Sequence, residues 1–129
     1  MPTNDTSPYV PPPPLRATIR REPGATVVSL AGEVDQDQYE TVRTRLAEAV
    51  RTEPSCLVVD LAGVGFCDSS GLNALLRARL DCEGRGVRLV LAAPTAQLRR
   101  LLDLTGAGEV FTVCDDVPAA VAVGTAAAR

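Results

Sequence analysis

Two adjacent serines, Ser69 and Ser70, have the residue type and the setting for chemistry in this chain. They follow an apolar run of strand length, Cys56 to Ala62, and they precede leucines at helical spacing. The spacing therefore predicts that a strand ends and a helix begins at the serines. At a helix N-terminus the first N–H groups have no internal partner and the helix dipole is positive. A hydroxyl there can cap the helix or can carry an anion such as phosphate, and the spacing alone favours the cap.

The residue content argues against several kinds of catalysis. The 129 residues leave room for one domain and include no histidine, which is the commonest general base and a usual zinc ligand. The four cysteines show no Cys-x-x-Cys spacing, which predicts reduced and mostly buried thiols. A serine hydrolase would need Gly-x-Ser-x-Gly at the turn, whereas Ser70 has Asp68 and Gly71 around it. We therefore expect no catalytic residue, no metal and no cofactor.

Charge and hydropathy limit the partners. The formal net charge is -3, no basic cluster stands out along the sequence, and aromatic residues make up 3%. These values argue against direct contact with nucleic acid. No apolar run approaches the roughly 18 residues that cross a membrane, and no secretory leader opens the chain. We therefore expect no membrane contact and a cytoplasmic location.

Changes in composition divide the chain into three parts. Residues 1–14 are rich in proline and are predicted to form a disordered tail. Residues 15–124 are predicted to form one folded domain, and residues 125–129 a frayed C-terminus. Within the domain, residues 15–20 and 26–31 form a predicted hairpin because the pair Pro23-Gly24 between them favours a turn. The first of these strands is polar and suits the edge of a sheet.

Helices and apolar strands alternate along the rest of the domain. The predicted elements are a helix over 39–50, a strand over 56–62, the serine-bearing helix to Gly86, a strand over 87–92, a helix after Thr95, a short strand over 110–113 and a terminal helix capped by Asp115 or Asp116. The alternation predicts an α/β fold. We expect a mixed, mostly parallel sheet of four to five strands with an N-terminal hairpin, packed against helices.

Acidic residues follow two of the predicted strands. In sheets of this kind, ligands and chemistry gather beyond the carboxyl ends of the strands. Asp35 comes after the second strand and Asp68 after the next one. If these strands are neighbours, both carboxylates and both serines share one edge of the protein. Asp35 or Asp37 is also the expected cap of the first helix.

Four motifs in this order carry a family resemblance. They are Gly32-Glu33-Val34-Asp35, the run from Leu57 to Val64, Phe66-Cys67-Asp68-Ser69-Ser70-Gly71-Leu72, and Leu101-Leu102-Asp103-Leu104-Thr105-Gly106. Together they resemble the STAS domain and, more narrowly, a bacterial anti-sigma-factor antagonist, also called an anti-anti-sigma factor. The resemblance covers approximately residues 15–124.

The resemblance implies a function and a site. In that family the unphosphorylated antagonist binds an anti-sigma factor, which is a serine kinase, and so frees a sigma factor. The kinase then phosphorylates the second serine of the motif, which matches Ser70, and a serine phosphatase resets the cycle. Two acidic residues of the docking site match Asp35 and Asp68. The predicted partner-binding set is Asp35, Asp68, Ser69, Ser70, Gly71, Leu72 and Asn73, and family members often have glycine at the position of Asn73.

Other interpretations remain open from the residues alone. The domain could instead be a STAS interaction module that docks a non-sigma partner in a signalling assembly. Ser69 is best explained as the helix cap. Cys67 could sense redox state, but the carboxylate of Asp68 beside it would raise its pKa, which favours a packing role. A phosphate on Ser70 is expected to change binding and not folding.

Overall fold

A computed structural model describes Pro8, Val10 and residues 14–126 of the chain. It contains five strands, four α-helices and two short 3-10 helices in this part of the chain. In chain order they are β1 (Arg16–Glu22), β2 (Ala25–Val34), η1 (Gln36–Gln38), α1 (Tyr39–Arg51), β3 (Cys56–Cys67), α2 (Ser69–Gly84), β4 (Arg88–Ala92), α3 (Ala96–Thr105), η2 (Ala107–Glu109), β5 (Thr112–Cys114) and α4 (Val117–Ala126).

The strands form one mixed sheet in the order β1-β2-β3-β4-β5. β1 is antiparallel to β2, with Pro23 and Gly24 as the hairpin turn, and the other neighbours are parallel. Gly24 has a φ of 79°, a conformation that a side chain would disfavour. The predicted α/β fold with an N-terminal hairpin is therefore confirmed, and the polar first strand lies at the edge as expected.

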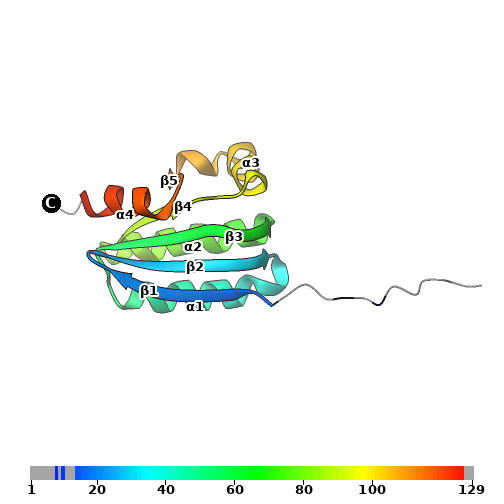
Figure 1. Cartoon of the computed structure of the whole chain (residues 1–129), viewed down its shortest axis with the longest axis horizontal. Helices are drawn as coiled ribbons and strands as arrows, with labels where there is room; N and C mark the ends of the chain where they lie inside the picture. The colour runs from blue at the N-terminus through cyan, green and yellow to red at the C-terminus, as the bar shows by residue number, and fades with distance from the viewer. Residues whose placement is uncertain (1–7, 9, 11–13, 127–129) are drawn as a thin grey trace, which may run out of the picture.

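Helices cover the two faces of the sheet unequally. α1 and α2 lie behind β1 to β3 in Figure 1, where valines and leucines of the strands meet those of the helices in the larger apolar core. α4 packs on the opposite face, and its Ala120 contacts a smaller core that includes Val58 and Val90. β3 is buried on both faces at its start, which explains the unbroken apolar run that begins at Cys56. On this face α4 covers only the start of β2, where Ala25 belongs to the smaller core, and β1 keeps exposed polar side chains.

β3 is longer than predicted, because it continues from Ala62 to Cys67. A bulge interrupts the pairing with β2 between Ser29 and Ala31. The carboxylate of Asp60 accepts a hydrogen bond from the backbone N–H of Ala62 at 3.1 Å and so stabilises the irregular backbone. Glycines hide the extension in the sequence, because they weaken the apolar alternation that marks a strand.

Two other boundaries differ from the prediction. β5 begins at Thr112 instead of Val110, because the N–H groups of Val110 and Phe111 both bond to the carbonyl of Ala107 in a tight turn. α4 continues through Thr125 and Ala126, beyond the predicted end of the domain at Gly124. Its cap is Asp116, whose carboxylate accepts from the N–H of Ala119 at 2.8 Å. Most of the tail that we predicted to be disordered lies outside the described residues, as do residues 127–129.

Gly124 gives a direct test of how α4 packs. A Cβ at this position would overlap the Sγ of buried Cys56, whereas a Cβ at Gly84, the last residue of α2, would meet nothing within 4 Å. We expect Gly124→Ala to lower the free energy of unfolding by about 1–3 kcal/mol, because the overlap must be relieved in a packed layer. Urea unfolding measures the change. Gly84→Ala is the matched control and should be neutral or slightly stabilising, and equal stability of the two variants would contradict the packing of α4.

Candidate functional site

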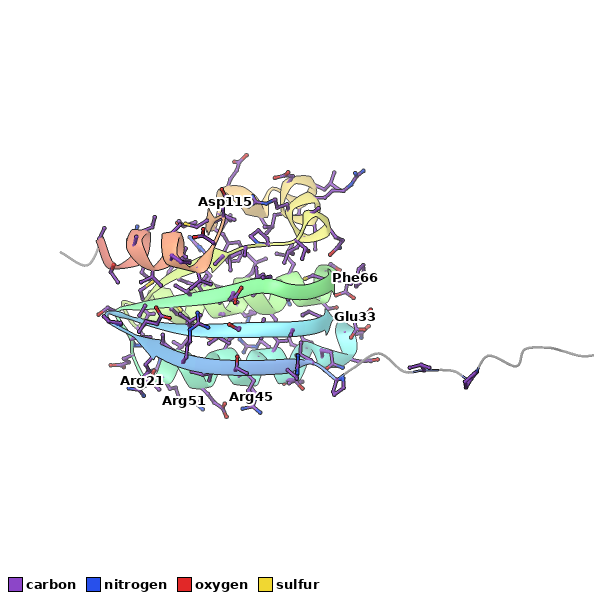
Figure 2. The ribbon with its side chains drawn as sticks, in the orientation of Figure 1. Arg21, Glu33, Arg45, Arg51, Phe66 and Asp115 are labelled. Carbon is purple, nitrogen blue, oxygen red and sulfur yellow. The ribbon has the colours of Figure 1, made fainter. Side chains whose placement is uncertain are left out.

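The ends of β2 and β3 bring the predicted acidic residues together. The two strands are parallel neighbours, and Val34 pairs with Cys67 at their carboxyl ends. Asp35 and Asp68 each follow one of these paired residues, and the N–H of Asp68 bonds to the carbonyl of Val34 at 3.2 Å. The preceding pair, Glu33 and Phe66, lies at the same end of the sheet (Figure 2). β2 and β3 are therefore neighbours, which is the condition under which the sequence predicts that both carboxylates and both serines share one edge of the protein.

Asp68, and not Ser69, caps the helix that carries the serines. Its backbone is extended, and its Oδ1 accepts a hydrogen bond from the N–H of Gly71 at 3.0 Å. Its carbonyl accepts the first helical bond, from the N–H of Leu72. Ser69 is already the first helical residue, so the predicted cap role of Ser69 is wrong. The reason is positional: the cap residue lies outside the helix, and aspartate fills that place as well as serine does.

The two serines therefore occupy the first turn of α2 without having to cap it. Ser69 is exposed and Ser70 is half-buried. Asp68 satisfies the N–H of Gly71, whereas the N–H groups of Ser69 and Ser70 precede the first helical bond. The serine hydroxyls therefore lie at the positive end of the helix dipole. The carboxylates of Asp35 and Asp68 lie at the same end of the sheet.

Gly71 and Leu72 are buried residues that hold the first turn of α2 against the sheet and the core. A Cβ on Gly71 would lie 2.6 Å from the carbonyl oxygen of Val34 and 2.7 Å from the Sγ of Cys67. Only glycine lets the first turn of α2 approach the ends of β2 and β3 so closely. Leu72 is 4% exposed and belongs to the core. Asn73 is exposed one helical turn after Ser69 and Ser70, and so shares their surface.

Asp35 shapes the neighbouring loop. Its Oδ1 accepts from the N–H of Asp37 at 3.0 Å, and its carbonyl accepts from the N–H of Gln38. It therefore caps the short helix η1 that leads into α1, whereas neither Asp35 nor Asp37 caps α1 directly. Two of the segments at this end of the molecule, residues 32–42 and 65–76, contain acidic residues and no arginine or lysine. We call these two segments the acidic end.

Gln97 of α3 is a supporting residue that sequence reasoning missed. Its side-chain amide donates to the carbonyl of Cys67 at 2.7 Å, and its Oε1 accepts from the N–H of Cys67 at 2.9 Å. β4 ends its pairing at Ala92, so it leaves the last part of β3 without a strand on that side. The amide of Gln97 replaces the missing strand at the residue before Asp68. No local pattern around a glutamine in a helix indicates such a contact.

The thiol of Cys67 lies directly under the site. It is buried, and burial together with the neighbouring Asp68 carboxylate raises its pKa from the ordinary value of 9.0 to about 12. Burial similarly raises the pKa of Cys82 to about 12. A protonated thiol is a poor nucleophile. This environment agrees with the packing role predicted for Cys67.

The described residues also bear on metals and membranes. Among residues 8, 10 and 14–126, no group of three or more histidine, cysteine or acidic side chains could hold a metal ion. Within the same part of the chain, no helix has the length and apolar character needed to cross a membrane.

Comparison with known proteins identifies the family. The family described as "Mlab, STAS domain" matches residues 17–113, and the chain therefore belongs to the STAS domain family. A similar curated protein is the anti-sigma-F factor antagonist RsfB of Mycobacterium tuberculosis, 30% identical over 97 residues, which cover 75% of this chain and 79% of RsfB. The anti-sigma F factor antagonist of Paenibacillus polymyxa is 27% identical over 103 residues, which cover 79% of this chain and 88% of that protein.

Solved structures share the fold. An anti-sigma factor antagonist from Mycobacterium paratuberculosis superposes with a TM-score of 0.79 at 24% identity, covering 85% of this chain and 93% of that one. SpoIIAA has been solved unphosphorylated and phosphorylated, with TM-scores of 0.64 and 0.59, each at 21% identity and 76% coverage of this chain. These matches cover 87% and 90% of the SpoIIAA chains.

Removing the Gln97 amide tests its support of the site. We expect Gln97→Ala to lower the free energy of unfolding by about 1–3 kcal/mol and to speed hydrogen exchange at the amide of Cys67, because both groups of that peptide lose a partner. NMR-detected exchange and urea unfolding report the two effects. Arg100→Ala, exposed on the same helix, is the control. An unchanged rate of hydrogen exchange at the amide of Cys67 would show that Gln97 does not stabilise the end of β3.

The raised pKa of Cys67 predicts a loss of stability in alkali. The unfolded chain releases the thiol proton near pH 9.0, whereas the folded protein keeps it until about pH 12. Ionisation therefore favours the unfolded state, and the stabilisation present below pH 9.0 is lost as the pH rises toward 12. Urea unfolding in reducing buffer at several pH values measures this slope. Cys67→Ala should have a lower free energy of unfolding, and this free energy should depend less steeply on pH than that of the wild type. An equal pH dependence of both proteins would contradict the raised pKa of Cys67.

Proposed function

We propose that this protein is an anti-sigma-factor antagonist. In its unphosphorylated form it binds an anti-sigma factor with serine kinase activity, and this binding frees a sigma factor. Phosphorylation of Ser70 by that kinase weakens the complex, and a serine phosphatase restores the active form. Membership of the STAS domain family and the names of the relatives support this role. The phosphorylated SpoIIAA structure shows that a protein of this fold can carry the modification.

The observation that carries the proposal is the capping of α2 by Asp68. Because the carboxylate of Asp68 already satisfies the N–H of Gly71, the fold does not need a serine hydroxyl as a cap. Ser70 is half-buried at the second position of the helix and Ser69 is exposed at the first. The choice of Ser70 as the phosphorylated residue rests on the family resemblance, and Ser69 provides a control one residue away.

The proposed docking surface consists of the accessible residues of the predicted set. Asp35, Asp68 and Ser70 are half-buried, while Ser69 and Asn73 are exposed. Gly71 and Leu72, also predicted to bind the partner, are buried, and in this proposal they hold the first turn of α2 in place. Since the acidic end carries no arginine or lysine, the partner is expected to present basic side chains to it.

Phosphorylation should change binding more than folding. A phosphate adds about -1.5 to -2 charges at neutral pH. The helix N-terminus favours an anion by about 0.3–1 kcal/mol, and the repulsion from Asp35 and Asp68 is screened by solvent and salt. These opposing contributions are small beside a typical unfolding free energy of about 5–15 kcal/mol. At an interface fitted to a hydroxyl, however, the dianion would need both space and a charged partner.

Two serine variants test the proposal. The protein is incubated with ATP and the candidate anti-sigma kinase of its own organism, and phosphate is located by mass spectrometry. We expect phosphate on the wild type and on Ser69→Ala, but not on Ser70→Ala. Ser70→Asp should weaken binding to the kinase at least about tenfold, because a charge replaces the hydroxyl at the interface. Its melting temperature should stay within about 4 °C of the wild type.

The possible outcomes separate the proposal from its alternative. Phosphate mainly on Ser69, or on neither serine, would contradict the assignment of Ser70. Unfolding of Ser70→Asp would contradict a switch that acts on binding alone. If the unphosphorylated protein binds no kinase-type anti-sigma factor, the alternative gains support, namely a STAS interaction module that docks another kind of partner.

A further inference from the structure

β1 leaves one side of the sheet unpaired. In the described part of the chain, β1 lies at the end of the strand order and pairs only with β2. Among the described residues, no strand pairs with its outer backbone N–H and C=O groups. Its seven residues give an edge roughly 23 Å long, enough for an added strand. A free edge of this kind accepts another strand unless its side chains prevent the approach.

Arginines flank this edge on both sides. Arg16 and Arg20 point to the open face of the sheet, because side chains alternate along a strand. Arg21 points to the other face, toward the side of α1. Figure 2 shows Arg21 together with Arg45 and Arg51 of α1 along one margin of the molecule. We call these five arginines and β1 the basic edge.

The basic edge has an excess of positive charge in an acidic protein. Glu22 pairs with Arg20 at 2.9 Å, and Glu48 approaches Arg45 at 3.7 Å. The salt bridges found within the described residues involve neither Arg21 nor Arg51. The chain as a whole has a formal net charge of -3. The sequence showed no basic cluster, because β1 and α1 supply these arginines from separate segments.

An apolar residue lies at the middle of the edge. Ile19 is 45% exposed and pairs with Val28 of β2, whose side chain belongs to the core. Ile19 therefore lies on the α1 side of the strand, at the margin of the core, and a residue on an added strand would cover it. A second copy of this chain would bring two positively charged edges together, which disfavours self-pairing.

We propose that the basic edge binds an extended acidic segment of a partner protein, which adds to the sheet beside β1. The backbone of the segment pairs with the outer side of β1, a central apolar residue covers Ile19, and flanking carboxylates meet the arginines. The part of this surface around Ile19 and Arg21 is separate from Ser70, because β2 lies between β1 and β3 and because Arg21 pairs with Thr26 near the start of β2. Binding here does not depend on the phosphorylation cycle proposed above.

A synthetic peptide of about eight residues tests the proposal, with aspartates and glutamates on both sides of one valine. Fluorescence polarisation measures its affinity for the full chain, and NMR locates the perturbed amides. We expect the perturbations at β1. The double variant Arg21→Glu with Arg51→Glu should weaken binding at least about tenfold. The control double variant Arg77→Glu with Arg100→Glu, both exposed on α2 and α3, should stay within about twofold.

A second peptide separates strand addition from simple charge attraction. The same sequence with N-methylated backbone amides keeps its charges but cannot pair as a strand, so it should bind at least about tenfold more weakly. Equal binding of both peptides would overturn the proposal, as would perturbations confined to other strands. Exchange protection of the outer β1 amides in the free chain would also overturn it, because the edge would already be covered. Dimerisation through β1 in sedimentation experiments would assign the edge to a second copy.

Discussion

The site depends on the close approach of the first turn of α2 to the ends of β2 and β3. This approach requires glycine at position 71, where a Cβ would lie 2.6 Å from the carbonyl oxygen of Val34. It also requires a cap from outside the helix, which Asp68 provides through the N–H of Gly71. The two requirements fix where the helix begins. The serines are thereby placed in its first turn, over the positive end of the helix dipole, and the helix does not need their hydroxyls as caps.

A second set of contacts keeps the strand end in position. β3 extends beyond its pairing with β4, so its last residues would present unpaired backbone groups on one side. The Gln97 amide bonds to both the N–H and the carbonyl of Cys67 and satisfies them there. Asp60 stabilises the bulge at which the long extension begins. The residue before Asp68 is therefore held from β2 on one side and from α3 on the other, which limits movement of the serine-bearing turn.

Charge is distributed unevenly over this small domain. The acidic end includes Asp35 and Asp68, and a phosphate there would add to negative charge that is already present. The basic edge, formed by β1 and α1, has the opposite charge because it carries an excess of arginine. The charged side chains of both regions lie outside the core, which consists mainly of valine, leucine and alanine. Stability and recognition thus use different residues, so a change of surface charge can alter binding while the fold persists.

The sequence by itself determined the order and type of the main elements, the hairpin, the edge position of β1 and the segment that carries the serines. Local patterns decide these features, since alternation, helical spacing and turn residues act over a few positions. The extension of β3, the contacts of Gln97 with Cys67 and the gathering of the arginines were decided only by tertiary structure. Each depends on groups that meet across strands or helices, and a hydrogen bond or a charge contact between distant segments leaves no periodic signal in the sequence.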